Sequence, residues 1–383
     1  MLKRIAILAV AVFWLWGSAH VLYDAAPPPS PQSGSKSAVH SSSSQKSTTK
    51  RHARRHRRRR WNPWHVSSFG EPAAEDDPSG EDPLVRAAAM EALGRWNGSV
   101  AVIDPNTGRI LSIVNQKLAL ESAFTPCSTF KPVVALGALK EELITPETNL
   151  RVGRRTRMNL TEALARSNNL FFAKLGQMLG FEKVSHYAHE FGLGEKAGWN
   201  IPGESPGKFP AKPPKEGGVG LLSSHGEDIE VTPLQMAALL AAIANGGTMY
   251  YLQYPRTPEE LGGFQPNVRR HLENLSEFFP YVKQGLAAAV LYGTARLAYD
   301  PEEQIFGKTG TCSEDGARLG WFVSYANERQ PKYVVVVLLR GGRPMYGPHA
   351  AEIAGKIYRD LRQRQQNAMR AERSYAASPT TEP

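Results

Sequence analysis

Two residues three positions apart, Ser128 and Lys131, have the side chains that a serine nucleophile and its base require. They follow Pro126 and precede an apolar run, residues 133–139, so we expect both at the start of one helix. At this spacing their Cβ atoms would lie roughly 5–6 Å apart on one helix face. A serine hydroxyl needs an adjacent base, and a partly desolvated lysine can lose its proton and act as one. Ser-x-x-Lys also occurs on ordinary surface helices, so the motif depends on the rest of the chain for support.

Two more short motifs follow in the chain and carry the groups that such a nucleophile would need. Ser167 and Asn169 offer a second hydroxyl and an amide, which could relay a proton and orient Lys131. Lys308, followed by Thr309 and Gly310, offers a fixed positive charge for a substrate carboxylate. Taken singly, the first motif is more often a helix cap or turn, and the second an ordinary edge strand.

The elements that must position these residues can be read from periodicity and turn signals. Two β-branched runs flank residues 104–108 (Asp-Pro-Asn-Thr-Gly), which predicts a hairpin. Thr232 and Pro233 are typical of a helix start. We further expect a loop at 194–214, strands at 320–325 and 333–339, and helices at 84–93, 160–172, 182–190, 282–291 and 350–361. This order predicts an α+β fold, an antiparallel sheet with a large helical insertion.

The net charge of the chain, +10, is concentrated in one stretch. Residues 50–60 (KRHARRHRRRR) hold eight lysines and arginines and leave a net charge of +2 for the rest. The excess is therefore a linear run and not the basic surface of a folded nucleic-acid-binding domain. It could bind an anionic surface such as lipid head groups or wall polymers, or be a solvated spacer.

The N-terminus predicts export. Lys3 and Arg4 precede an apolar stretch, residues 5–23, which is long enough for either a cleaved signal peptide or a membrane anchor. The basic pair favours a cytoplasmic start with the rest of the chain outside. We accordingly divide the chain into an anchor or signal peptide (1–23), a disordered Pro/Ser/Arg-rich linker (24–82), a folded domain (83–367) and a flexible tail (368–383).

The three motifs, in this order and behind an export segment, resemble those of the transpeptidase domain of penicillin-binding proteins. The resemblance covers roughly residues 98–361. Further segments match the family: Asp104-Pro-Asn-Thr-Gly108, Phe191-Gly-Leu-Gly194, Ile201-Pro-Gly-Glu204, Thr232-Pro-Leu-Gln235, Ala244-Asn-Gly-Gly247 and Gly293-Thr294-Ala295. The chain departs from the family at Ser223-Ser-His225-Gly226, where Gly-x-Gly is more usual, and has a short segment at 114–124.

The resemblance implies a β-lactamase/transpeptidase-like fold, an antiparallel five-stranded sheet with a helical subdomain. It implies catalytic roles for Ser128, Lys131, Ser167, Asn169 and Lys308, and substrate binding by Thr309, Gly310 and Thr311. The backbone N–H groups of Ser128 and Thr311 would form the oxyanion hole. No metal and no cofactor is expected. Only about 80 residues precede the domain, so we expect neither the glycosyltransferase domain nor the pedestal domain of larger family members.

The activity implied by the resemblance is that of a peptidoglycan D,D-transpeptidase or D,D-carboxypeptidase. Such an enzyme acts on D-Ala-D-Ala peptides through a serine acyl-enzyme and binds penicillin covalently. The alternatives are a serine β-lactamase, for which the chain lacks a convincing Glu-x-x-Leu-Asn loop, and a non-catalytic penicillin-binding receptor or scaffold. The expected partners are peptidoglycan stem peptides, β-lactams, the membrane and other cell-wall synthesis proteins. The expected location is the cell inner membrane, with the catalytic domain in the periplasm.

The two cysteines, Cys127 and Cys312, adjoin the first and third motifs. In the implied fold the Lys308 strand borders the start of the Ser128 helix, and class A serine carbapenemases have bridged cysteines in corresponding places. An exported chain meets an oxidising compartment. The resemblance therefore predicts a Cys127–Cys312 disulfide, with two buried free thiols as the alternative.

Overall fold

The computed structural model describes residues 64–376, and the expected membrane segment and basic run lie outside them. The helices are α1 Pro83–Leu93, α2 Gln116–Leu120, η1 Cys127–Phe130, α3 Lys131–Lys140, α4 Leu160–Ala165, α5 Asn169–Leu179, α6 Phe181–Glu190, α7 Gly218–His225, α8 Pro233–Ala244, α9 Pro258–Gly262, α10 Glu273–Ser276, α11 Phe279–Leu291, η2 Arg296–Ala298 and α12 Gly347–Ala376. The strands are β1 Gly98–Ile103, β2 Ile110–Val114, β3 Leu150–Arg151, β4 Arg157–Met158, β5 Thr248–Tyr251, β6 Asn267–His271, β7 Ile305–Glu314, β8 Ala317–Ala326 and β9 Val334–Gly341. In this part of the chain no helix has the length and apolar character needed to cross a bilayer.

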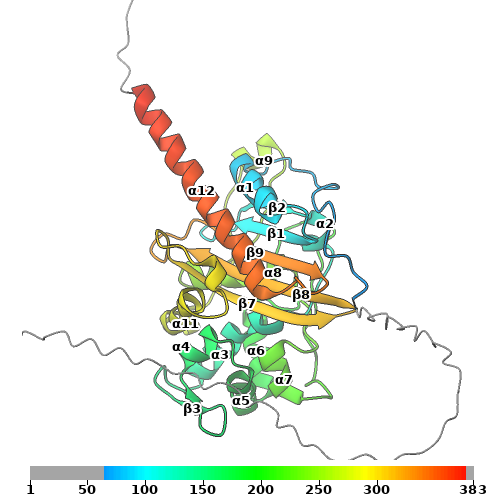
Figure 1. Cartoon of the computed structure of the whole chain (residues 1–383), viewed down its shortest axis with the longest axis vertical. Helices are drawn as coiled ribbons and strands as arrows, with labels where there is room; N and C mark the ends of the chain where they lie inside the picture. Colours follow the sequence, from blue (N-terminus) through cyan, green and yellow to red (C-terminus); the bar gives the residue numbers. More distant parts are fainter. Residues whose placement is uncertain (1–63, 377–383) are drawn as a thin grey trace, which may run out of the picture. The chain divides into compact units, whose positions relative to one another are not determined.

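Five strands form one antiparallel sheet in the order β2-β1-β9-β8-β7. The β1–β2 hairpin and the last three strands come from opposite ends of the domain sequence, and the helices from α2 to α11 are inserted between them (Figure 1). The predicted α+β fold with a five-stranded antiparallel sheet is confirmed. Strand β7, which carries Lys308, lies at one edge of the sheet.

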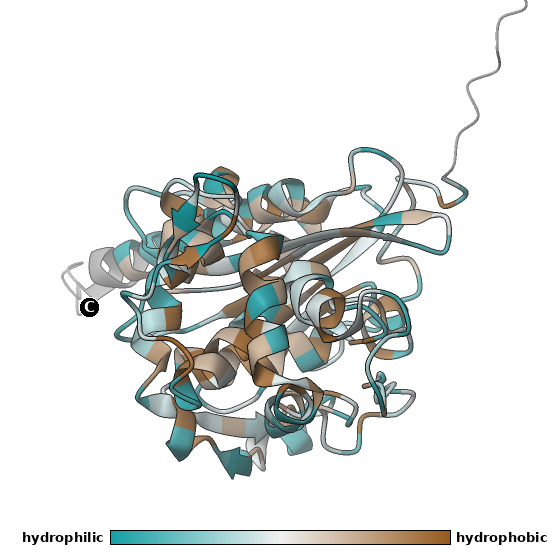
Figure 2. Cartoon of the chain, turned by 90° about the horizontal axis from the view of Figure 1, so that it is seen from below, coloured by the Kyte–Doolittle hydropathy of each residue, from teal (hydrophilic) through white to brown (hydrophobic). Residues whose placement is uncertain are grey.

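Both faces of the sheet are covered, which explains the uninterrupted apolar run in β9. Val334, Val336 and Leu338 contact the core shared with α3 and α8, while Val335 and Val337 contact the core shared with α1 and α12. Successive strand residues point to opposite faces, so a strand buried on both sides is apolar throughout. In Figure 2, apolar residues (brown) run along the central strands and parts of the helices, and polar residues (teal) lie in the connections and on other parts of the helices.

Several predicted elements have the expected ends. Helices α1, α6 and α11 end where the sequence predicted and begin one to three residues earlier. Helix α8 begins with the predicted cap: Thr232 Oγ1 accepts from Gln235 N at 3.1 Å, and Gln235 Oε1 accepts from Thr232 N at 2.8 Å. This reciprocal pair satisfies two N–H groups at the helix start. Helix α12 is much longer than predicted and continues past residue 367 to Ala376.

The segment before α1 differs from the expected linker, which was assigned to residues 24–82. Residues 64–82 lie against the domain: Ser68 Oγ accepts from Gly342 N at 2.8 Å, and the Phe69 ring stacks on Trp96 at 4.5 Å. Asp76 and Glu81 form ion pairs with Arg86 at 2.8 and 3.2 Å. The folded domain therefore begins before the expected start at Pro83. The sequence did not indicate this, because the partners of residues 64–82 are mostly distant in the sequence.

Candidate active site

Ser128 lies in η1, a short 3-10 turn that runs directly into α3. The turn is built by local bonds: Thr129 Oγ1 donates to Pro126 O at 2.6 Å, and Lys131 N donates to Ser128 O. Cys127 has φ +52°, the left-handed region that non-glycine residues rarely adopt. The Ser128 side chain is partly exposed, and among the described residues its hydroxyl has no hydrogen-bond partner. The hydroxyl is thus free to meet a substrate.

Lys131 is fully buried one turn further on, at the first residue of α3. Its Nζ donates to Ser167 O at 2.8 Å, to Ser167 Oγ at 3.1 Å and to Asn169 Oδ1 at 2.6 Å. Burial, and then the charge of Lys308, holds the pKa of Lys131 well below its ordinary value. A neutral amine can keep two of these donated bonds and has a lone pair left to accept a proton.

Ser167 and Asn169 reach Lys131 because the chain turns sharply between α4 and α5. The sequence predicted one helical segment over 160–172, and this was wrong. Ser167 has φ +53°, which ends α4, and Asn168 Oδ1 accepts from Phe171 N at 2.9 Å to start α5. The break directs both the carbonyl and the hydroxyl of Ser167 at the Lys131 amine. A backbone strained at this point is typical of a functional site.

Lys308 lies on β7, and Ser167 stands between it and Lys131. The Lys308 Nζ donates to Ser167 Oγ at 2.8 Å and to Thr309 O at 2.9 Å. Complete burial lowers the pKa of Lys308 to about 7. Within residues 64–376, no carboxylate hydrogen-bonds to either lysine or to Ser167. A charged Lys308 amine that is buried without an anion favours the binding of a substrate carboxylate beside it.

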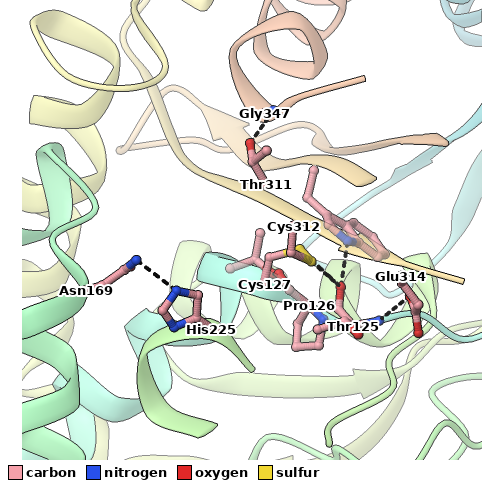
Figure 3. The surroundings of a disulfide bond; sticks show 11 residues. Thr125, Pro126, Cys127, Asn169, His225, Thr311, Cys312, Glu314 and Gly347 are labelled. Atoms are coloured by element: carbon pink, nitrogen blue, oxygen red, sulfur yellow. Dashed lines mark hydrogen bonds between the residues drawn. A yellow bond between two sulfur atoms is a disulfide. The ribbon is translucent and has the colours of Figure 1, made fainter. Parts of the chain in front are cut away.

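The other β7 residues of the motif divide between the two sides of the strand. Gly310 faces the turn that carries Ser128. Thr309 is buried, and its Oγ1 lies 2.6 Å from Thr294 Oγ1. Thr311 is exposed and its hydroxyl accepts from Gly347 N at 2.8 Å, as Figure 3 shows. Its own proton remains available, so Thr311 is the better placed of the two threonines to bind a carboxylate.

A disulfide joins the turn that carries Ser128 to β7. Cys127 and Cys312 are bonded, with a Cα–Cα distance of 5.7 Å, so the predicted bridge is confirmed and the free-thiol alternative is wrong. Thr125 adds two links beside it: Thr125 O accepts from Trp321 Nε1 at 3.0 Å, and Thr125 N donates to Glu314 Oε2 at 3.1 Å (Figure 3). Three links from β7 and β8 therefore hold the segment immediately before Ser128.

Sequence reasoning noted His225 only as part of a departure from the family motif and gave it no role. The His225 Nε2 lies 2.9 Å from Asn169 Nδ2, and its Nδ1 lies 2.8 Å from Ser224 Oγ. Burial, and then the charge of Lys131, lowers the pKa of His225. No sequence spacing links the two partners, which lie 56 residues apart. Thr294 and Glu314 were missed as contact residues for the same reason.

Residues 98–360 match the family described as the penicillin binding protein transpeptidase domain. This chain belongs to that family. Stage V sporulation protein D of Bacillus subtilis is 30% identical over 324 residues, covering 70% of this chain and 50% of that protein. The peptidoglycan D,D-transpeptidase MrdA of Acinetobacter baumannii is 24% identical over 350 residues, covering 72% and 52%. The chain thus spans about half the length of these relatives.

Solved structures of transpeptidase domains have the same fold. The transpeptidase domain of Burkholderia pseudomallei penicillin-binding protein 3 superposes with a TM-score of 0.64 at 22% identity, covering 80% of this chain and 98% of that one. The D,D-transpeptidase domain of an Eggerthella lenta peptidoglycan glycosyltransferase gives 0.61 at 21% identity, covering 74% and 82%. The fold implied by the sequence resemblance is confirmed.

Proposed function

We propose that this penicillin-binding domain is a serine-type D,D-transpeptidase or D,D-carboxypeptidase acting on D-Ala-D-Ala peptides of peptidoglycan. The observation that carries the proposal is the arrangement of Ser167 between Lys131 and Lys308 at 3.1 and 2.8 Å. The partly exposed Ser128 precedes Lys131 by one turn. This arrangement supplies a nucleophile, a buried amine base, a bridging hydroxyl and an unpaired positive charge.

In the first half of the reaction, the neutral Lys131 amine takes the proton of Ser128 Oγ. The oxygen attacks the carbonyl carbon of the penultimate D-Ala, and the backbone N–H groups of Ser128 and Thr311 stabilise the oxyanion. The C–N bond then breaks. The Ser167 hydroxyl passes its proton to the departing amine of the terminal D-Ala and regains one from the Lys131 ammonium, 3.1 Å away. This leaves an ester on Ser128 and a neutral Lys131.

In the second half, the ester is attacked by an amine, which gives transpeptidation, or by water, which gives carboxypeptidation. The neutral Lys131 amine takes the proton that the attacking amine or water loses and gives it to Ser128 Oγ as the ester C–O bond breaks. A β-lactamase needs a group that activates water rapidly, and a carboxylate is one such group. The absence of a carboxylate from the bonds of Ser167 and both lysines, within residues 64–376, supports a long-lived acyl-enzyme.

We further propose that residues 1–23 attach the chain to the inner membrane, with the catalytic domain in the periplasm. The apolar stretch at 5–23 and the disulfide both support export to an oxidising compartment. Residues 50–60 would contact an anionic surface, and other cell-wall synthesis proteins would be partners.

The decisive experiment is to incubate the full chain with a fluorescent penicillin and follow labelling and release over time. We expect labelling of wild-type protein, an adduct on Ser128 by peptide mass spectrometry, no labelling of Ser128→Ala, and release over hours. No adduct in the folded wild-type chain would overturn the enzyme proposal in favour of a scaffold. Rapid turnover of the label would favour a β-lactamase.

A stem pentapeptide ending in D-Ala-D-Ala distinguishes the two enzymatic outcomes. Release of D-Ala in buffer indicates carboxypeptidase activity, and incorporation of an added D-amino acid into the product indicates transpeptidase activity. Neither reaction in a chain that forms the penicillin adduct would contradict the proposed substrate while leaving the acyl-enzyme intact.

A further inference from the structure

His225, the last residue of α7, occupies a position that the transpeptidase chemistry does not use. It lies within the sequence Ser224-His225-Gly226 and is partly buried beside Asn169 (Figure 3). We propose that His225 is a positioning residue whose neutral Nδ1–H form fixes the Asn169 amide, and through it the Lys131 amine. This inference rests on the proposed function, because it assigns Lys131 as the base.

The orientation of Asn169 follows from its partners. The structure places the Asn169 carbonyl oxygen 2.6 Å from the Lys131 amine, which donates to it. The NH2 group of Asn169 must then face His225, at 2.9 Å from Nε2. Because that NH2 group can only donate, Nε2 of His225 must be the acceptor and carries no proton.

The other side of the imidazole completes the assignment. A neutral ring with a bare Nε2 carries its proton on Nδ1, which lies 2.8 Å from Ser224 Oγ. The Ser224 hydroxyl accepts there and donates its own proton to Gly220 O at 2.7 Å. An unbroken series of hydrogen bonds therefore runs from the α7 backbone through Ser224, His225 and Asn169 to the Lys131 amine. A glycine at 224, as in the usual family motif, would leave Nδ1 without this partner.

The chain of bonds has a consequence for the base. With Nε2 as acceptor, the amide plane of Asn169 is fixed and its oxygen stays on Lys131. The second proton of the NH2 group remains free for a substrate carbonyl. Without an acceptor at 225, the amide can rotate, and the Lys131 amine loses the shortest of its three hydrogen bonds.

Two variants separate positioning from packing. His225→Leu removes the acceptor, and His225→Gln keeps one, because Gln Oε1 stands as many bonds from Cβ as His Nε2. We expect the second-order rate constant for fluorescent penicillin acylation to fall about tenfold in His225→Leu. The acylation rate constant of His225→Gln should be within about threefold of the wild-type value. His186→Leu, at an exposed histidine on α6, is the control and should match wild type.

Two further measurements make the test strict. If His225 acts through Asn169, the Asn169→Ala/His225→Leu double variant should be no slower than Asn169→Ala alone. Nitrogen NMR of histidine-labelled full chain, assigned by the signal lost in His225→Gln, should show Nδ1 protonated and Nε2 bare. The inference would be overturned if His225→Leu were acylated at the wild-type rate. It would also be overturned if the rate losses of Asn169→Ala and His225→Leu multiplied in the double variant, or if the NMR signals showed the proton on Nε2. A wild-type chain that never forms the Ser128 adduct would instead overturn the proposed function, while the NMR result would still decide the histidine form.

Discussion

A Cβ atom on Gly310 would lie 2.9 Å from the carbonyl oxygen of Pro126. It would also lie 3.1 Å from Thr129 Cγ2. Residues on both sides of Ser128 therefore contact this one position of β7. The family resemblance assigned Gly310 to substrate binding. The structure gives a second reason for a glycine: it allows the edge strand to approach the turn that presents Ser128.

Gly310→Ala should therefore displace β7 from the Ser128 turn. We expect the acylation rate to fall at least tenfold, because the oxyanion donors from the two segments would separate. The melting temperature should also fall, since backbone atoms are less able to yield than side chains. A matched control is Gly262→Ala, where a Cβ would have no neighbour within 4 Å. Acylation at the wild-type rate in Gly310→Ala would contradict this account.

Lys308 should make stability rise with pH above neutrality. Its pKa is about 7 when folded and near 10.5 when unfolded, so between these values the unfolded state holds a proton that the folded state has released. Stability then grows by roughly 1 kcal/mol for each pH unit. Urea unfolding at pH 7.5 and 9.5 should show wild type gaining roughly 2 kcal/mol or more relative to Lys308→Met. The control is Lys140→Met, at a partly exposed lysine, and its free energy of unfolding should change with pH as that of wild type does. The same pH dependence in wild type and Lys308→Met would refute the prediction.

Loss of the disulfide should weaken both stability and acylation. Cys127 and Cys312 are 185 positions apart, and removing a bridge of this kind costs about 2–4 kcal/mol. We expect Cys127→Ser/Cys312→Ser to lose that much in urea unfolding and to acylate severalfold more slowly. The fold should persist, because Trp321 and Glu314 still hold Thr125. Cys312→Ser alone, which leaves the residue next to the nucleophile intact, should behave in the same way. Unchanged stability and rate in both variants would show that the bridge is dispensable.

Arg86, on α1, should be the residue whose loss most weakens the attachment of the segment before α1. It pairs with Asp76 and Glu81, whose side chains are 3% and 1% exposed, and donates to Ile113 O at 2.6 Å. Arg86→Met leaves two buried carboxylates without their cation, which we expect to cost about 3–5 kcal/mol in urea unfolding. Arg95→Met is the control, because its ion pair with Glu71 is largely exposed and should contribute about 1 kcal/mol or less. Equal losses in the two variants would contradict the prediction.

Local patterns predicted most of the sheet and its helices from the sequence. The apolar run in β9, the turn at 104–108 and the Thr232–Gln235 cap depend on residues close together in the chain, and all three formed as expected. The break at Ser167 could not be predicted in this way. Its left-handed backbone is set by contacts with Lys131 and Lys308, which lie far away in sequence.

The residues of the candidate site also fall into two groups, those that local motifs predicted and those whose partners are distant in sequence. The family motifs predicted Ser128, Lys131 and Lys308 by residue type and spacing, and the cysteines by their adjacency to those motifs. His225 and the N-terminal segment before α1 carry no such pattern. Their partners are fixed only when α7 packs against α5, and when Asp76 and Ser68 reach Arg86 of α1 and Gly342, just after β9.

The Cys127–Cys312 bridge also makes a covalent ring out of the polypeptide. All of the inserted helices from α3 to α11 lie inside it, together with the Gly- and Pro-rich loop at 194–214. A protease that cuts this loop once would leave the two fragments joined by the Cys127–Cys312 bond, next to Ser128. The nicked protein would migrate as one species until it is reduced, so a single surface cleavage would not release the nucleophile from the strand that it faces.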